Sequence, residues 1–411
     1  MKEVRVGVVG AGGIFTGGHL PAYVKVPEAR LVAIADPSEY SLKRALRRIE
    51  EVFSAEIKSL KEKGLEDQAE RLREILPSIK IYRDYREMLR KEDIDLVDVC
   101  TPHKFHKPIA VDALRAGAHV MVEKPMARTY IEALEIVEAV RETGKLYQHN
   151  ENYIFSRGNY TVRRLIEAGT IGEVSYLTVP GSHEGPEWKE WFWDPNVGGG
   201  GSMLDMGVHS IGVAWYLVGL DKRPTVVKAE KFTGITIKIK NRFIAGVFTE
   251  IKVEDDAHVL INFEDPKDSS WTTALIEGSW SGKEIEHTAV FGTKGMITVR
   301  GVNGKAVVDI TDYLGVKRTI EVQEYVFDGT IIREISNMCK CILSGRKSIL
   351  DEEKGAEIMA IIDAAYYSEM NGRRAVSLDE FKRFAEKLIE KYGSKASDEF
   401  IKMKVSYLSR L

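Results

Sequence analysis

The sequence VRVGVVGAGGIF, residues 4–15, joins an apolar run to a glycine-rich turn. The run Val4–Val9 is rich in valine, which is typical of a buried strand in a parallel sheet. The turn Gly10–Phe15 follows directly, and a second apolar run, Leu31–Ala35, ends in Asp36. This order of strand, glycine turn, helix, strand and acid predicts a Rossmann-type dinucleotide-binding unit.

Each position of the glycine turn has a defined task in such a unit. The first glycine allows the tight turn, the second lets the backbone approach the pyrophosphate, and the helix N-terminus faces its negative charge. We expect the cofactor to be lined by Gly10, Gly12, Gly13, Ile14 and Phe15. Phe15 occupies the third glycine position, so we expect looser packing of the helix on the strand or a shifted loop.

Asp36 ends the second strand at about the spacing of the acid that binds the adenosine ribose hydroxyls. Its negative charge would repel a 2′-phosphate, so we expect NAD as the cofactor and NADP as the less favoured one. The alternative is that Asp36 is only a turn residue in front of Pro37.

Length and composition set the protein class. The chain has 411 residues, 44% of them hydrophobic, and a net charge of −3, which allows two domains with sizeable cores. The near-balanced charge disfavours nucleic acid as a partner. No apolar run approaches the roughly 20 residues that span a bilayer, and the start resembles a strand rather than a signal peptide. The three cysteines, Cys100, Cys339 and Cys341, show no disulfide or metal spacing, so we expect a cytoplasmic protein without a membrane partner.

The segment 41–78 interrupts the expected alternation of strands and helices. Leu, Glu, Lys and Arg recur there at helical spacing, and Gly64 is expected to break the helix. We expect two solvated helices inserted between the second and third strands.

Two later strands also end in polar residues. The apolar runs 96–100 and 119–122 are followed by the pairs Thr101-Pro102 and Glu123-Lys124. In an open α/β sheet, ligands bind at the carboxyl ends of the strands, so a lysine held there by Pro125 is a functional candidate. The alternative is a surface lysine that caps an ordinary turn.

The loop after residue 100 carries two histidines, His103 and His106. They could be metal ligands, but no third ligand lies nearby in the sequence, so we expect no metal and a loop that closes over the cofactor. The expected cofactor contacts at these strand ends are Thr101, Pro102, His106, Glu123 and Lys124.

The second half of the chain is expected to hold an α+β domain with one large, mostly antiparallel open sheet. Its predicted strands include Ile235–Ile239, Ile244–Glu250, His258–Phe263, Ala274–Trp280 and Thr288–Phe291. We expect a dinucleotide-binding domain over 1–148, a substrate and oligomerisation domain over 149–375, and a helical tail over 376–411. Because an open sheet buries one face against its own helices, a subunit partner would cover the other, which predicts a homodimer or homotetramer.

The stretch GGGGSMLDMGVHSI, residues 198–211, places Asp205 and His209 four residues apart on an expected helix. The glycines would let the backbone approach a ligand closely. Such an Asp/His pair could hold a metal, be a satisfied interior pair, or act as a base with its orienting group. A strand-end lysine in the same chain favours the catalytic interpretation.

Several motifs, taken in order, resemble one family. GAGGIF…HLPAY, ADPS, DLVDVCTPHKFH, ALRAGAHVMVEKPMA and GGGGSMLDMGVHSI are similar to the glucose–fructose oxidoreductase, inositol dehydrogenase and MocA family, over residues 1 to about 370. The resemblance implies that Lys124, Asp205 and His209 are the catalytic positions. One departure is that Ile154 stands where many relatives carry an arginine, two residues after Asn152.

Hydride transfer from an alcohol needs a base for the hydroxyl proton, and an imidazole suits this task. We expect His209 to be the base and Lys124 to stabilise the developing alkoxide. Asp205 would orient His209 or bind a neighbouring hydroxyl. Other expected substrate contacts are Asn152, His183 and Trp188, the last within an aromatic cluster that could equally be a core or oligomer contact.

These features predict an NAD-dependent dehydrogenase that interconverts a hydroxyl and a ketone on a sugar, inositol or related polyol. One alternative is an NAD-dependent glycoside hydrolase that oxidises its substrate transiently. Another is a non-catalytic NAD-binding regulator, although such a protein would have no need of the proton-transfer residues.

Overall fold

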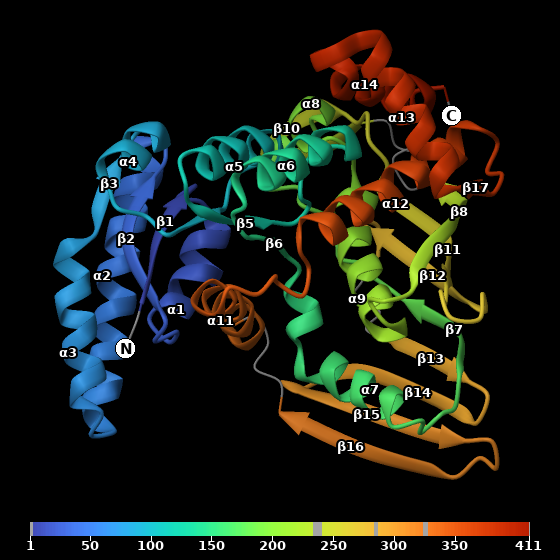
Figure 1. Cartoon of the computed structure of the whole chain (residues 1–411), viewed down its shortest axis with the longest axis horizontal. Helices are drawn as coiled ribbons and strands as arrows, with labels where there is room; N and C mark the ends of the chain where they lie inside the picture. Colours follow the sequence, from blue (N-terminus) through green and yellow to red (C-terminus); the bar gives the residue numbers. More distant parts are fainter. Residues whose placement is uncertain (1–2, 233–240, 283–286, 324–327, 411) are drawn as a thin grey trace. The chain divides into compact units, whose positions relative to one another are not determined.

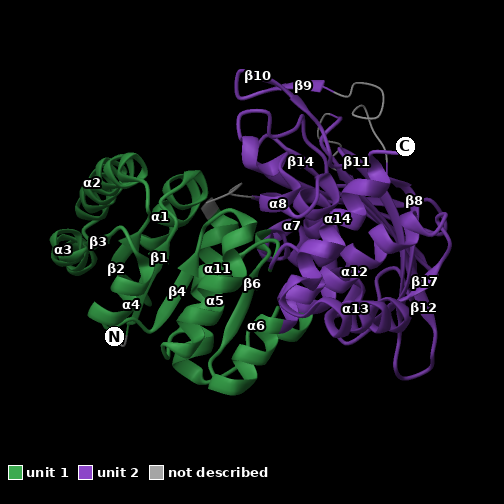
Figure 2. Ribbon diagram, turned by 90° about the horizontal axis from the view of Figure 1, so that it is seen from above, with its two compact units in different colours: residues 1–126, 135–152, 326–355 green, residues 127–134, 153–325, 356–411 purple. Residues whose placement is uncertain are grey.

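The computed structural model describes residues 3–232, 241–282, 287–323 and 328–410. The chain forms two compact units (Figure 2). Unit 1 comprises residues 1–126, 135–152 and 326–355, and unit 2 comprises residues 127–134, 153–325 and 356–411. The units are therefore not the consecutive segments that the sequence suggests, because 326–355 returns to unit 1.

Unit 1 is built on a six-stranded sheet in the order β3-β2-β1-β4-β5-β6, and every pairing in it is parallel. Its strands are β1 (Val4–Val9), β2 (Ala29–Ala35), β3 (Lys80–Tyr82), β4 (Leu96–Val99), β5 (His119–Glu123) and β6 (Tyr147–Asn150). The helices that accompany them are α1 (Leu20–Tyr23), α2 (Glu39–Glu62), α3 (Glu66–Ile75), α4 (Tyr85–Lys91), α5 (His106–Arg115) and α6 (Tyr130–Thr143). This is the doubly wound order of a Rossmann fold, as the sequence predicts.

The register of this sheet brings its carboxyl ends into one row. Val9 at the end of β1 pairs with Ala35 of β2 and with Val99 of β4, and Val99 pairs with Val122 of β5. The loops that follow these strands therefore leave from the same edge.

The predicted helical insertion is present as α2 and α3, which lie side by side (Figure 1). Ser38 caps α2 by accepting a hydrogen bond from the Ser41 N–H at 3.2 Å. Gly64 separates the two helices with a φ of 72°, where glycine is favoured. The helices are amphipathic rather than wholly solvated, because α2 buries side chains such as Ile49 and Phe53 in the core of unit 1.

Helix α11 (Asp328–Ser344) also contributes to the core of unit 1. Its buried apolar residues are Ile331, Ile335, Met338 and Cys339. These four side chains pack in the same cluster as residues of β1 and α1. Their burial explains why this late segment belongs to the dinucleotide-binding unit.

Unit 2 contains a nine-stranded sheet in the order β16-β15-β14-β13-β7-β12-β11-β8-β17. Its strands are β7 (Val174–Val179), β8 (Arg223–Phe232), β11 (Asp256–Glu264), β12 (Trp271–Ser279), β13 (Thr288–Gly292), β14 (Gly295–Val302), β15 (Lys305–Asp312), β16 (Lys317–Gln323) and β17 (Val376–Ser377). Among the described strands of this sheet, only the β7–β12 pairing is parallel, so the prediction of a large, mostly antiparallel sheet is confirmed. Helices α7 (Arg157–Glu167) and α9 (Val208–Val218) pack on this sheet.

One predicted strand is wrong and another lies outside the described residues. Ile235–Ile239 falls in the undescribed segment 233–240. The predicted strand Ile244–Glu250 is instead a hairpin of β9 (Asn241–Ile244) and β10 (Val247–Glu250) in a separate two-stranded sheet. The chain reverses at Ala245 and Gly246, whose φ values of 48° and 89° belong to a tight turn.

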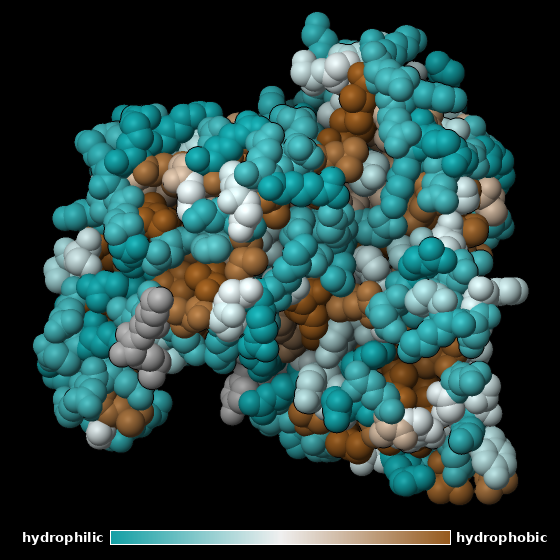
Figure 3. Space-filling model, viewed as in Figure 1, coloured by the Kyte–Doolittle hydropathy of each residue, from teal (hydrophilic) through white to brown (hydrophobic). Residues whose placement is uncertain are grey.

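The C-terminal segment is integrated into unit 2. After β17 come α13 (Leu378–Tyr392) and α14 (Ala396–Leu408), and they follow α12 (Glu352–Met370) in the chain. Lys404 of α14 is buried and its Nζ lies 3.4 Å from Asp363 Oδ1 of α12. On the face shown in Figure 3, hydrophilic residues predominate and hydrophobic residues gather in separate patches. Among the described residues, no helix is long and apolar enough to cross a membrane.

The packing of α2 makes a prediction about stability. Phe53 is 1% exposed, so Phe53→Ala should lower the free energy of unfolding by about 3–5 kcal/mol through the cavity it leaves. Leu46 on the same helix is 38% exposed, and Leu46→Ala should change it by less than about 0.5 kcal/mol. Urea denaturation followed by circular dichroism measures both. Equal effects of the two changes would show that α2 does not bury this face.

Candidate active site

Gly10 occupies a position that admits no side chain. Its φ is 104°, and a Cβ there would lie 2.3 Å from the carbonyl oxygen of Cys100, the residue after β4. The chain can therefore turn sharply out of β1 while it packs against the end of β4. This is the tight turn that the dinucleotide fingerprint requires.

Asp36 follows β2 and holds the glycine turn in place. Its Oδ2 accepts a hydrogen bond from the Ala11 N–H at 2.8 Å, and its Oδ1 accepts one from the Ser38 N–H at 2.8 Å. The bond to Ser38 shows that the Asp36 carboxylate stabilises the turn through Pro37 that precedes α2. This was one of the two interpretations of Asp36. Each carboxylate oxygen has a further lone pair, so these bonds leave acceptor capacity for a ribose hydroxyl.

Phe15, at the third glycine position, is fully buried in the core of unit 1. It begins a π-helical turn, η1 (Phe15–His19), which leads into α1. The chain thus enters α1 through a π-turn, and the Phe15 ring is packed in the core of unit 1.

The edge of the sheet fits a dinucleotide. A Cβ on Gly12 or Gly13 would meet nothing within 4 Å, so the space in front of this turn is open to a ligand. Thr101, at the end of β4, has a buried hydroxyl oxygen with no hydrogen-bond partner among the described residues. Open backbone beside an unsatisfied hydroxyl suits a ligand that carries hydrogen-bonding groups, as the NAD pyrophosphate and ribose do.

Glu123 is the last residue of β5, and Lys124 follows it. The peptide bond between Lys124 and Pro125 is cis. His106, predicted to contact the cofactor, is buried between this loop and the loop after β4. Its Nδ1 lies 2.8 Å from the Pro125 carbonyl oxygen, and its Nε2 lies 2.7 Å from the Thr101 carbonyl oxygen. The ring therefore fastens the two strand-end loops to each other, and with them the backbone that carries Lys124.

A buried polar network behind Glu123 was not predicted from the sequence. His19 of η1 is fully buried, with Nδ1 2.7 Å from Asp98 Oδ2 and Nε2 2.9 Å from Glu123 Oε1. The Tyr23 hydroxyl also donates to Asp98 Oδ2 at 2.6 Å. Asp98 is an acid in the middle of a buried apolar strand, and that position was the available signal, because such a charge requires partners.

In unit 2, the glycine-rich stretch leads into a second π-turn, η6 (Met203–Gly207), followed by α9. Asp205 lies in this turn and is buried. Its Oδ2 accepts a hydrogen bond from Trp280 Nε1 at 2.9 Å and lies 3.3 Å from His183 Nε2. The Gly185 N–H donates to His183 Nδ1 at 2.8 Å, so Nε2 is the ring nitrogen that can carry a proton toward Asp205.

His209 is buried at the start of α9, and its ring stacks on that of Tyr153 with centroids 4.3 Å apart and planes 18° apart. Tyr153 belongs to η4 (Asn152–Phe155) and is partly exposed. The stacking fixes the plane of the imidazole. Neither Tyr153 nor Trp280 was singled out from the sequence, because both reach the pair only through the tertiary fold.

The remaining predicted substrate contacts differ in environment. Trp188 is 69% exposed, whereas Trp193 of the same cluster is buried and packs on Trp280 with ring centroids 4.7 Å apart. Trp193 is therefore a core residue, one of the interpretations left open for this cluster. Asn152 donates from Nδ2 to Thr330 Oγ1 at 3.1 Å within unit 1.

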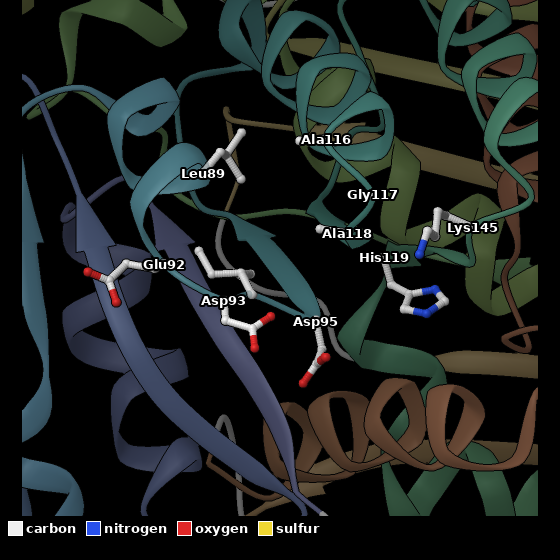
Figure 4. Close-up of a pocket in the computed structure, with 10 residues that line it drawn as sticks. Leu89, Glu92, Asp93, Asp95, Ala116, Gly117, Ala118, His119 and Lys145 are labelled. Carbon is white, nitrogen blue, oxygen red and sulfur yellow. The ribbon is translucent and has the colours of Figure 1, made fainter.

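A pocket of about 270 Å³ lies at the opposite edge of the unit 1 sheet (Figure 4). Its lining includes Asp95, just before β4, and His119, the first residue of β5. These residues mark the amino ends of the strands, whereas ligands of open α/β sheets bind at the carboxyl ends. The pocket is therefore not the dinucleotide site.

Family models match the sequence of both units of the chain. A family model described as an oxidoreductase family with an NAD-binding Rossmann fold matches residues 4–151, and the GFO/IDH/MocA C-terminal domain matches residues 160–298. The chain therefore belongs to the Gfo/Idh/MocA family of oxidoreductases, and unit 1 carries its NAD-binding fold.

Individual relatives make the comparison more specific. D-glucoside 3-dehydrogenase of Escherichia coli is 26% identical over 91% of this chain and 97% of its own length. Levoglucosan dehydrogenase of Pseudarthrobacter phenanthrenivorans is 28% identical over 53% of this chain and 52% of its own length. A glycosyl hydrolase family 109 protein of Shewanella is 31% identical over 45% of this chain and 36% of its own length. A levoglucosan dehydrogenase solved with NADH has a TM-score of 0.74 at 20% identity, covering 92% of this chain and 99% of that one.

Two glycines of the turn yield distinguishable predictions. Gly10→Ala forces a Cβ against the Cys100 carbonyl, so it should destabilise the protein by at least about 1–3 kcal/mol and abolish NAD binding. Gly12→Ala meets no protein atom, so it should leave the thermal midpoint nearly unchanged and weaken NAD binding at least tenfold. Thermal unfolding and calorimetric titration with NAD measure the two effects. Unchanged NAD affinity in Gly12→Ala would contradict the proposed approach of the cofactor.

Proposed function

We propose that the protein is an NAD-dependent dehydrogenase that interconverts a hydroxyl and a ketone on a sugar or related polyol. The observation that carries the proposal is the glycine turn after β1, whose open backbone lies at the carboxyl edge of a parallel sheet. The named activities of the relatives, a D-glucoside 3-dehydrogenase and levoglucosan dehydrogenases, support a carbohydrate substrate. NAD is favoured over NADP because the Asp36 carboxylate would repel a 2′-phosphate. When bound, NAD accepts or returns the hydride.

In this proposal His209 is the general base that removes the hydroxyl proton. An imidazole exchanges protons in the physiological pH range, and the stack on Tyr153 holds the ring in one plane. Asp205 is the accompanying carboxylate, held by the Trp280 indole and by His183. Since Asp205 is anchored in this way, it can orient a neighbouring donor, either His209 or a substrate hydroxyl, without reorganising during the reaction.

Lys124 is assigned the task of stabilising negative charge on the substrate oxygen. Its ammonium group offers three donors and a full positive charge, and both suit a developing alkoxide. The backbone around it is held by the contacts of His106 with Thr101 and Pro125. We assign Thr101, Pro102, Ile14 and Glu123 to the surroundings of the cofactor, and Asn152, His183 and Trp188 to those of the substrate.

These assignments predict the effects of two substitutions. Lys124→Ala and His209→Ala should each reduce kcat by at least ~100-fold, the amount expected when a group that transfers or stabilises charge is lost. His209→Ala should keep its NAD affinity, because His209 is assigned to the substrate. The assay follows NADH absorbance with glucosides, anhydrosugars, aldoses and inositols as substrates. His258→Ala is the matched control and should turn over normally, since His258 lies in strand β11 beside Asp256. Near-normal turnover in His209→Ala would refute the assignment of His209 as the base.

A second candidate is an NAD-dependent glycoside hydrolase, which the likeness to glycosyl hydrolase family 109 supports. Such an enzyme returns the hydride within each cycle, so a glycoside would be cleaved with no accumulation of NADH. Release of the free sugar from a nitrophenyl glycoside, with constant NADH absorbance, would replace the dehydrogenase proposal with this one.

We also propose that the large sheet of unit 2 assembles with a second copy of the chain. Tyr176, Phe291 and Met296 are half-buried neighbours on adjacent strands, with the Tyr176 and Phe291 ring centroids 5.7 Å apart. The residues that alternate with them, such as Val290 and Ile297, are buried. An apolar, partly open sheet face of this kind is suited to a like surface on a partner.

Light scattering coupled to size-exclusion chromatography tests this assembly. The wild-type chain should elute as a dimer or tetramer, and Phe291→Glu should dissociate it because a charge enters the apolar face. Tyr313→Glu, in the exposed turn after β15, is the control and should assemble normally. A monomeric wild type, or a Phe291→Glu variant that still assembles, would exclude this face.

A further inference from the structure

Behind the strand end that carries Lys124 lies a buried group of metal-ligating side chains. His19, Glu123 and Glu334 each place one ligand atom within 4.8 Å of the others. They come from η1, β5 and α11, so three elements that are distant in the sequence meet at this point. All three belong to unit 1.

Glu334 is the observation that points to a ligand. Its side chain is fully buried, and neither carboxylate oxygen has a hydrogen-bond partner among the described residues. An unsatisfied buried carboxylate is costly, because removal of a polar group from water is offset only by new partners. Here one Glu334 oxygen lies within 4.8 Å of a ring nitrogen of His19 and of a carboxylate oxygen of Glu123.

His19 contacts a carboxylate through one ring nitrogen, as histidines that bind metals usually do. Its Nδ1 lies 2.7 Å from the buried Asp98 carboxylate, while its Nε2 is directed toward Glu123. In metal sites, a carboxylate that accepts from the second ring nitrogen fixes the tautomer and makes the ligating nitrogen more basic. The Tyr23 hydroxyl donates to the same Asp98 oxygen and holds the carboxylate in turn.

We propose that His19, Glu123 and Glu334 bind a divalent transition-metal cation, with Zn²⁺ the best match. One imidazole nitrogen and two carboxylate oxygens are ligands that suit zinc, whereas Mg²⁺ and Ca²⁺ prefer oxygen ligands alone. Two ligands of one zinc ion stand at most about 4.2 Å apart, so small rotations of the two glutamate side chains complete the site. The ion fastens α11 to the sheet and to the residue that precedes Lys124.

The competing arrangement uses protons in place of a cation. Burial disfavours a charge on His19, but Asp98 outweighs it and raises the pKa of His19 well above its ordinary value. Burial likewise raises the pKa of Glu334, which would then remain a neutral acid. That arrangement leaves both Glu334 oxygens without a hydrogen-bond partner among the described residues. A cation would instead coordinate a Glu334 oxygen directly.

A second group of possible ligands, Asp256, His258 and Glu277, lies in unit 2 and serves as a control. A cation already occupies its surroundings, because Lys231 forms an ion pair with Asp256. Its members lie on β11 and β12, where Asp256 is buried and His258 and Glu277 are partly exposed. Zinc bound there would depend on His258 rather than on Glu334.

The test measures zinc directly and does not depend on turnover. Full-length protein is expressed with added ZnSO4, purified without chelator and analysed by mass spectrometry for metal, then stripped with EDTA and titrated calorimetrically with Zn²⁺ and Mg²⁺. We expect about one zinc per chain and no binding of Mg²⁺. Glu334→Gln should weaken zinc binding at least tenfold, and Asp98→Asn by 10–100-fold, whereas His258→Gln should bind as the wild type does.

A wild-type chain that holds no zinc would overturn the proposal, as would zinc binding that is lost in His258→Gln and retained in Glu334→Gln. Glu334→Gln preserves shape and removes only the charge, so it should fold. If it does not, anomalous diffraction at the zinc edge from wild-type crystals decides the question. A peak beside His19 and Glu334 supports the site, and a peak elsewhere or none refutes it.

Discussion

The close approach of Gly10 to the carbonyl of Cys100 is the constraint on which the dinucleotide-binding unit depends. It is possible because β1 and β4 are parallel neighbours whose last residues, Val9 and Val99, are paired. The same register aligns the ends of β2 and β5, so the loops with Asp36 and Lys124 leave from the same edge. Cofactor recognition and the candidate lysine therefore follow from one alignment of strands.

Buried polar contacts then hold the candidate site residues in each unit. In unit 1, His106 contacts the loops after β4 and β5. His19 bridges the carboxylates of Asp98 and Glu123. In unit 2, Asp205 is held by Trp280 and His183. The π-turns η1 and η6 lead directly into α1 and α9. Irregular helical turns of this kind are common at functional sites, where they redirect a side chain at the cost of regular hydrogen bonding.

The parts that the sequence predicts well are those encoded locally. The apolar runs, the glycine turn and the acid at Asp36 lie within one short segment, and their order alone specifies the parallel sheet. The hairpin at Ala245 and Gly246 was missed because the apolar pattern continues through the turn. The roles of His19, Trp280 and Glu334 depend on partners far away in the sequence, and the return of α11 to unit 1 depends on packing that no local pattern reports.

We propose that the carboxyl edge of the unit 1 sheet binds NAD through the glycine turn and selects it through Asp36. Calorimetric titration of the whole chain with NAD and with NADP measures this most directly. We expect one site per chain that binds NAD at least tenfold more tightly than NADP. Equal or tighter binding of NADP would contradict the role of Asp36, and binding of neither nucleotide would contradict the account of the site.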